Sequence, residues 1–143
     1  MSHLDFKYSE TDRYGFVVHP YKGTTKKELT LKPGDFVVIN NQEESSYMGL
    51  LDGIGKKGSF PTDIVFVLSE RKITTAPPTA EYPLQVELLH LMDEWGIQLI
   101  RFLKEADAEM FDKCKNRLSQ ITALRYTYMN LNHDDPTLQR QLW

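Results

Sequence analysis

Residues 32–39 read Lys32-Pro33-Gly34-Asp35-Phe36-Val37-Val38-Ile39, which is a turn followed directly by four apolar residues. Adjacent proline and glycine favour a tight turn, and β-branched and aromatic residues favour a strand. Similar short apolar runs occupy residues 16–18, 47–51 and 64–67, and turn-forming residues separate them. Short strands spaced in this way predict a small antiparallel barrel or sandwich over residues 14–68.

The C-terminal half has the period of helices. Apolar residues recur every three to four positions over residues 84–103 and make about half of that helix surface apolar. One neighbouring helix covers roughly a third of such a surface, so we expect two packing partners. Residues 108–129 predict a second helix, and the short connection predicts an antiparallel hairpin. The start signal Asp135-Pro136 predicts a third helix from residue 136, truncated by the end of the chain.

The remaining segments complete the expected organisation. Residues 1–13 form an N-terminal extension, and residues 69–83 form a proline-containing linker, because Pro77-Pro78 favours an extended backbone. We therefore expect an α+β protein, in which a small β-barrel at residues 14–68 precedes a helical region at residues 84–143.

Charge and composition exclude several classes of function. The 143 residues carry 17 basic and 20 acidic side chains, and this net charge of −3 argues against nucleic acid as a main partner. The single cysteine, Cys114, cannot form an internal disulfide, so a cytosolic location is expected. No apolar run approaches the roughly 20 residues of a membrane span, and the N-terminus does not resemble a signal peptide.

Residues suited to catalysis do not form a recognisable set. The four histidines fit no metal-ligand spacing, and Cys114 falls on the apolar side of a predicted helix. Residues 53–58 resemble a phosphate-binding loop, but they lack the Ser or Thr after the lysine and the helix that such a loop requires. They are better explained as the tip of a hairpin. We expect a non-catalytic chain without cofactor or metal.

Three segments of the β half resemble SH3 domains in order and spacing. They are residues 17–21 (Val17-Val18-His19-Pro20-Tyr21), residues 28–35, which run from Glu28-Leu29 to Gly34-Asp35, and residues 58–65, which contain Gly58-Ser59-Phe60-Pro61. The resemblance implies a five-stranded barrel with an aromatic groove for left-handed proline helices.

The resemblance also assigns the groove residues. The groove positions are His19, Tyr21, Ser46, Pro61 and Ile64, and a slip of one residue in the alignment would put Tyr47 in place of Ser46. Glu28, Glu43 and Glu44 are the acids available to a basic ligand residue, opposed by the three lysines of the loop at residues 22–28. Because Ser46 and Ile64 replace aromatic side chains, we expect weak binding of ordinary Pro-x-x-Pro peptides.

The helical half resembles the region after the N-terminal SH3 domain of the DOCK (dedicator of cytokinesis) family, which comprises large exchange factors for Rac-type GTPases. The resemblance rests on residues 82–87, on Asp93-Glu94-Trp95-Gly96 and on Glu109-Met110-Phe111. The degraded groove suggests a divergent invertebrate member. The resemblance implies a cytoplasmic regulatory module, recruited to the membrane by partners, that acts in engulfment and cell migration. It implies that an ELMO (engulfment and cell motility) scaffold binds both groove and helices, and that the SH3 domain restrains the exchange domain of its own chain.

The surface expected to meet partner helices lies on the first predicted helix and comprises Leu84, Leu88, Leu91, Met92, Trp95 and Leu99. Two alternatives stay open. The SH3 domain and the hairpin can instead bury these faces on one another, with no partner required. The chain can also be an atypical SH3 module of an unrelated adaptor or motor protein, although such a module does not need the helical half.

Overall fold

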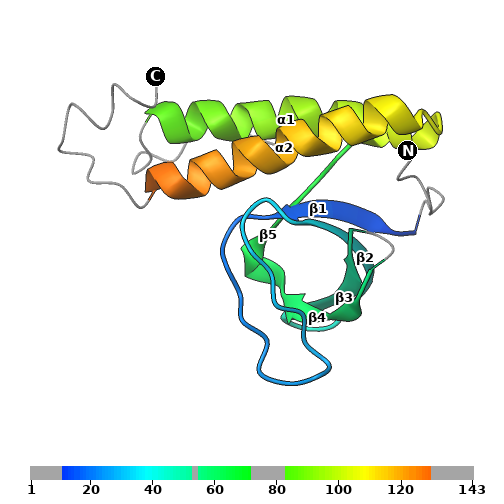
Figure 1. Cartoon of the computed structure of the whole chain (residues 1–143), viewed down its shortest axis with the longest axis vertical. Coiled ribbons are helices and arrows are strands. Elements are labelled where there is room, and N and C mark those ends of the chain that lie inside the picture. Colours follow the sequence, from blue (N-terminus) through cyan, green and yellow to red (C-terminus); the bar gives the residue numbers. More distant parts are fainter. Residues whose placement is uncertain (1–10, 53–54, 72–82, 130–143) are drawn as a thin grey trace.

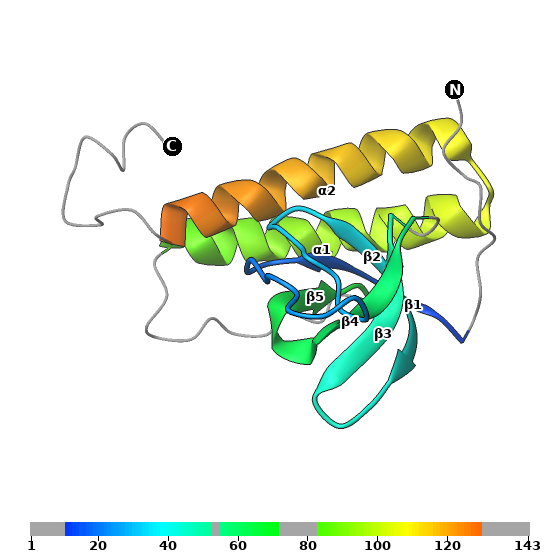
Figure 2. The same ribbon diagram turned by 60° about the horizontal axis from the view of Figure 1, so that its bottom comes forward.

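A five-stranded antiparallel sheet and two helices form the part of the chain that the computed structural model describes, residues 11–52, 55–71 and 83–129. The strand order is β4-β3-β2-β1-β5, and the sheet curls into a small barrel beneath the two helices (Figures 1 and 2). The elements are β1 (Arg13–Val17), β2 (Phe36–Gln42), β3 (Ser46–Leu51), β4 (Lys57–Pro61), β5 (Val65–Val67), α1 (Pro83–Lys104) and α2 (Ala108–Met129), with a short 3-10 helix at Thr62–Ile64. The predicted α+β class is confirmed. The N-terminal extension up to residue 10, residues 72–82 of the linker and the third helix lie outside the described residues.

A type II turn starts β2. The Asp35 amide donates to the Lys32 carbonyl at 3.1 Å, and the Asp35 carboxylate accepts from the Lys32 amide at 2.9 Å. Gly34 has a φ of 98°, which explains why glycine follows proline at this turn. The turn therefore forms where the sequence predicts it.

Strand β2 is apolar at four successive positions because both of its faces are covered. Val37 and Ile39 point into the barrel, where they join the buried side chains Val17, Leu29, Leu31, Tyr47, Phe60 and Ile64. Phe36 and Val38 point the other way and join a second core under the helices, together with Tyr14, Phe16, Leu88, Met92, Leu99, Phe111 and Leu118. The alternation of side chains along the strand thus connects two cores.

Helices α1 and α2 form the predicted antiparallel hairpin, and they lie side by side in both views. Ala106 adopts a left-handed φ of 56°, and the Asp107 amide donates to the Phe102 carbonyl at 3.0 Å, which ends α1 in a Schellman-type turn. The Asp107 carboxylate then accepts from the Met110 amide at 3.2 Å and caps α2. One residue therefore closes the first helix and opens the second.

The hairpin is docked tightly onto the barrel, as expected from the alternative in which the two bury their apolar faces on one another. The Ser119 hydroxyl of α2 donates to the Gly34 carbonyl at 2.6 Å, and a Cβ at Gly34 would lie 2.8 Å from the Ser119 carbonyl oxygen. A Cβ at Gly96, the only glycine of α1, would lie 2.8 Å from Cδ2 of Leu68, which follows β5. Both glycines therefore permit close approach between barrel and hairpin. The two packing partners that α1 requires are α2 and the barrel.

Candidate functional site

The residues predicted to form a peptide groove come from three separate segments, which the barrel brings together. Ser46 at the start of β3 pairs with Pro61 at the end of β4, and the Thr62 amide donates to the Ser45 carbonyl at 3.1 Å. The Val18 amide, next to His19, donates to the Ile64 carbonyl at 2.7 Å. His19, Ser46 and Pro61 are partly exposed, whereas Ile64 is only 8% exposed and belongs to the barrel core. We call this set, with Tyr21, the peptide groove, after the role that the SH3 resemblance predicts for it.

Tyr47 does not belong to the groove. Its ring is 8% exposed and packs against Phe60 inside the barrel, with 6.0 Å between the ring centroids. The Arg13 guanidinium lies over the same ring at 5.0 Å. Because side chains alternate along a strand, burying Tyr47 leaves Ser46 on the groove side. The alignment without a slip is therefore the right one, and the groove lacks an aromatic side chain at this position.

Glu28 holds the loop between β1 and β2 in place. Its Oε2 accepts from the Tyr21 hydroxyl at 2.5 Å, and its Oε1 accepts from the Thr24 hydroxyl and from the amides of Thr24 and Thr25 at 2.8, 3.0 and 3.2 Å. The bond from Tyr21, followed by those from Thr24, lowers the pKa of the Glu28 carboxyl to about 2. The same bond raises the pKa of Tyr21.

This network bears on the role expected of Glu28. The sequence predicts an acid that binds a ligand arginine, but four internal hydrogen bonds already occupy the carboxylate. The role in ligand binding stays a prediction, and what the structure shows is that Glu28 accepts from the hydroxyl of the groove residue Tyr21. The other two predicted acids, Glu43 and Glu44, are exposed in the turn between β2 and β3, where the Glu43 amide donates to the Ser46 carbonyl at 2.9 Å.

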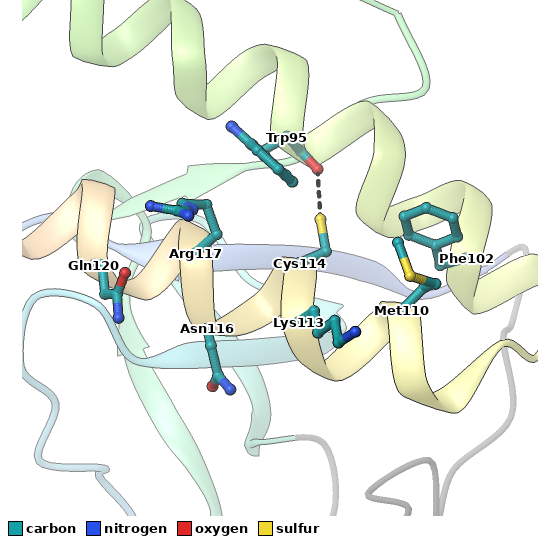
Figure 3. Close-up of a pocket in the computed structure, with 8 residues that line it drawn as sticks. All are labelled: Trp95, Phe102, Met110, Lys113, Cys114, Asn116, Arg117 and Gln120. Atoms are coloured by element: carbon teal, nitrogen blue, oxygen red, sulfur yellow. Dashed lines mark hydrogen bonds between the residues drawn. The ribbon is translucent and has the colours of Figure 1, made fainter.

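A second surface lies on the hairpin. A groove of about 450 Å³ runs between the helices, where Trp95 and Phe102 of α1 face Met110 and Arg117 of α2 (Figure 3). The Arg117 guanidinium lies 5.9 Å from the centre of the Trp95 ring. Beneath them, the Cys114 thiol donates to the Trp95 carbonyl at 3.1 Å, and burial raises the pKa of this thiol to about 12. The thiol is therefore a packed, protonated group and not a nucleophile.

Met110 and Leu124 extend this surface along α2. They are 37% and 39% exposed, and with Arg117 they are spaced by seven residues, or two helical turns, on the same stripe. Ser119, which contacts the barrel, lies on the opposite side of the helix. We call the half-buried Leu91, Trp95 and Phe102 and the exposed Met110 and Leu124 the outer face.

The outer face differs in part from the interface predicted for α1. Leu88, Met92 and Leu99 are 5%, 0% and 0% exposed and belong to the core between hairpin and barrel, so the chain itself covers them. Leu91 and Trp95 remain partly exposed, and the side chain of Leu84 lies outside the described residues. Met110 and Leu124 belong to the apolar side of the second predicted helix but were not included in the predicted interface, although their spacing from Arg117 was a detectable signal.

No group of three or more His, Cys, Asp or Glu side chains is placed to hold a metal ion within residues 11–52, 55–71 and 83–129. Neither α1 nor α2, the two long helices in the same ranges, is apolar enough to cross a membrane.

The chain is similar to known proteins over the barrel and beyond it. Residues 14–68 match the family described as "Variant SH3 domain". Dedicator of cytokinesis protein 4 from Homo sapiens and from Mus musculus are each 25% identical over 134 residues, which cover 88% of this chain and 7% of each relative. A solved structure, the C-terminal SH3 domain of myosin IB from Entamoeba histolytica bound to an EhFP10(GEF) peptide, aligns with a TM-score of 0.40 and 24% identity, covering 48% of this chain and all of that one.

The family match falls on the barrel described above, and the similarity to the two longer relatives extends through the helices. The chain spans only 7% of the length of those relatives. Residues 14–68 are therefore an SH3 domain, and the chain is a distant homologue of dedicator of cytokinesis protein 4.

Proposed function

We propose that the chain is a non-catalytic regulatory and protein-interaction module of a DOCK-type Rac exchange factor, and that it binds an ELMO-type scaffold. The partner's helices pack on the outer face of the hairpin, and its proline-rich tail occupies the peptide groove. Support comes from the extent of the similarity to dedicator of cytokinesis protein 4, because 88% of the chain cannot be covered by the SH3 domain alone.

The observation that carries the proposal is the outer face. The apolar side chains Met110 and Leu124 are exposed on the same stripe of α2, and Trp95 borders the groove beside that stripe. Two antiparallel helices with a groove between them, lined by Trp95, Phe102 and Met110 among polar side chains, present a surface onto which an amphipathic helix packs. The barrel covers the other side of the hairpin, so this is the side available to a partner.

The peptide groove contributes less of the affinity. Ser46 offers no stacking surface and Ile64 is largely inside the barrel. Each missing aromatic contact weakens binding by about 0.5–1.5 kcal/mol beyond its area, whereas truncating a buried anchor such as a tryptophan costs 2 kcal/mol or more. We therefore assign most of the binding free energy to the hairpin.

The proposal extends to regulation. The DOCK-family resemblance implies that this module folds back on the exchange domain of its own full-length chain, and that scaffold binding at the membrane relieves the restraint during engulfment and cell migration. The isolated chain then has no exchange activity. Nucleotide release from a Rac-type GTPase, measured with residues 1–143 alone, is expected to stay at the uncatalysed rate.

Co-purification of residues 1–143 with the C-terminal fragment of an ELMO-type scaffold tests the proposal. The unmodified chain is expected to retain the fragment, and Met110→Asp and Leu124→Asp are expected to lose it, because each places a charge in the apolar interface. Asn40→Asp is the matched control, since it adds the same charge at an exposed position of β2. Equal retention by all four proteins would contradict the proposal.

The alternative function is that of an atypical SH3 module from an unrelated adaptor or motor protein. It is favoured by the retained groove residues Tyr21 and Pro61, both partly exposed. In that case Tyr21→Ala abolishes binding of a proline-rich ligand, and the charge substitutions on the outer face have no effect on it.

A further inference from the structure

Helix α2 reaches the peptide groove. The ring of Tyr126, in the last turns of α2, lies edge-on to the His19 ring, with 6.1 Å between centroids and 79° between planes. Both side chains are partly exposed, so the pair is on the surface. His19 is the groove position that follows β1, and the amide of its neighbour Val18 donates a hydrogen bond to the Ile64 carbonyl. An aromatic ring from outside the SH3 domain therefore borders this end of the groove.

The position of Tyr126 is fixed by the docking of α2. Ser119, whose hydroxyl bonds to the Gly34 carbonyl, precedes Tyr126 by seven residues, so the two side chains lie on the same side of the helix two turns apart. Between them, Thr122 is 1% exposed and donates to the Leu118 carbonyl at 2.7 Å. This side of α2 therefore contacts the barrel at both Ser119 and Tyr126, two turns apart, and the docking places the Tyr126 ring beside His19.

We propose that Tyr126 is a ligand-contacting residue of the peptide groove, and that the bound segment is an extended, proline-rich peptide. The inference rests on the groove part of the proposed function. Proline rings pack on aromatic faces, and the peptide in its left-handed helix is already ordered before binding. Ser46 and Ile64 leave two groove positions without an aromatic surface, and the pair of His19 and Tyr126 supplies one from an element that ordinary SH3 domains do not contain.

The consequence is that the hairpin helps to select the peptide. A ligand that enters at the His19 end contacts an SH3 side chain on one side and a helical side chain on the other. The loss of one aromatic contact corresponds to a decrease in affinity of about two- to tenfold. Recognition therefore depends on residue 126, which is 58 positions beyond the end of the family match at residue 68.

The test is an NMR titration of residues 1–143 with a synthetic peptide of ten prolines. We expect Tyr126→Ala to weaken binding about two- to tenfold, and Tyr126→Phe to bind like the unmodified chain. Thr127→Ala is the matched control, because Thr127 is exposed and its hydroxyl bonds only within the helix, to the Ala123 carbonyl at 3.0 Å. In the unmodified chain we also expect nuclear Overhauser effects between the proline ring protons and the Tyr126 ring, a readout that requires no variant.

Unchanged or tighter binding by Tyr126→Ala would overturn the inference, as would the absence of those Overhauser effects at saturation. If Tyr126→Ala fails to fold, the Overhauser effects alone decide. Failure of the unmodified chain to bind decaproline at all would overturn the inference together with the peptide-binding part of the proposed function. That result would not affect the proposed binding of partner helices to the outer face, which the co-purification experiment tests separately.

Discussion

Replacing Phe111 by alanine is expected to destabilise the barrel as well as the hairpin. The Phe111 ring is fully buried, and it meets the Phe36 ring of β2 edge-on with 5.9 Å between centroids. Phe→Ala substitutions at such sites cost about 3–5 kcal/mol, because they remove buried surface and leave a cavity. Domains are stable by only about 5–15 kcal/mol, so the loss is a large share of the total.

Urea unfolding followed by circular dichroism at 222 nm measures this free energy. In a thermal scan the melting temperature should fall by about 10–17 °C, which is the free-energy loss divided by the unfolding entropy of a chain of this size. Met110→Ala is the matched control one residue away, where a 37% exposed side chain predicts a cost of less than about 1 kcal/mol. Hydrogen exchange should accelerate in β1 and β2 as well as in the helices of Phe111→Ala. An equal cost for the two variants, or unchanged protection of the strands, would refute the reasoning that barrel and hairpin share a core.

Three further predictions concern single groups. Ala106→Gly should raise the stability by roughly 1 kcal/mol in thermal denaturation, because Ala106 has a φ of 56°, a conformation that glycine adopts without strain; an unchanged melting temperature would count against it. The only thiol, Cys114, is 1% exposed, and burial raises its pKa to about 12. A thiol reagent at neutral pH should therefore modify it only when the chain unfolds. Rapid modification of the native protein would contradict this prediction. The Glu28 carboxyl should titrate near pH 2 by carbon-13 NMR. Because folding lowers its pKa, the contribution of this group to stability is complete above its ordinary pKa of 4.5 and is lost as the pH falls towards 2. A titration midpoint near 4.5 would show that the hydrogen bond from Tyr21 is absent.

Local patterns in the sequence predicted most of the fold. The Pro33-Gly34 turn, the strand after it and the hairpin of α1 and α2 follow from residue type and period, because these features depend on near neighbours. Strand β4 (Lys57–Pro61) was missed by pattern alone, since it begins with Lys57 and Gly58 and was explained as part of a hairpin tip. Gly58 is buried there, and a Cβ would lie 3.0 Å from Cγ of Leu29, so tertiary packing and not strand propensity selects glycine.

Which of two apolar faces a helix buries depends on tertiary packing and was harder to predict. Leu88, Met92 and Leu99 were expected to face a partner, and they face the barrel. The unbroken apolar run of β2 was the signal for this, because a strand in a half-exposed sheet alternates with polar residues and this one does not. The unbroken apolar run of β2 and the half-apolar surface of α1 together predict that the barrel carries a second apolar face and that the hairpin covers it.

The candidate site was predictable only where the SH3 pattern applies. Motif spacing assigned His19, Tyr21, Ser46 and Pro61 to the peptide groove, and this assignment stays a prediction. The commitment of Glu28 to internal hydrogen bonds depends on the path of its loop, and the approach of Tyr126 to His19 depends on docking between residues 107 positions apart. Neither has a local signature in the sequence.

Titration calorimetry of residues 1–143 with the C-terminal fragment of an ELMO-type scaffold tests the central claim most directly. The unmodified chain, Trp95→Ala, Tyr21→Ala and the charge control Asn40→Asp are compared, after circular dichroism has shown that each is folded. The account predicts that Trp95→Ala weakens binding about thirtyfold or more, that Tyr21→Ala has a smaller effect, and that Asn40→Asp has none. An affinity that is lost in Tyr21→Ala and unchanged in Trp95→Ala would contradict the assignment of the outer face as the main partner-binding surface.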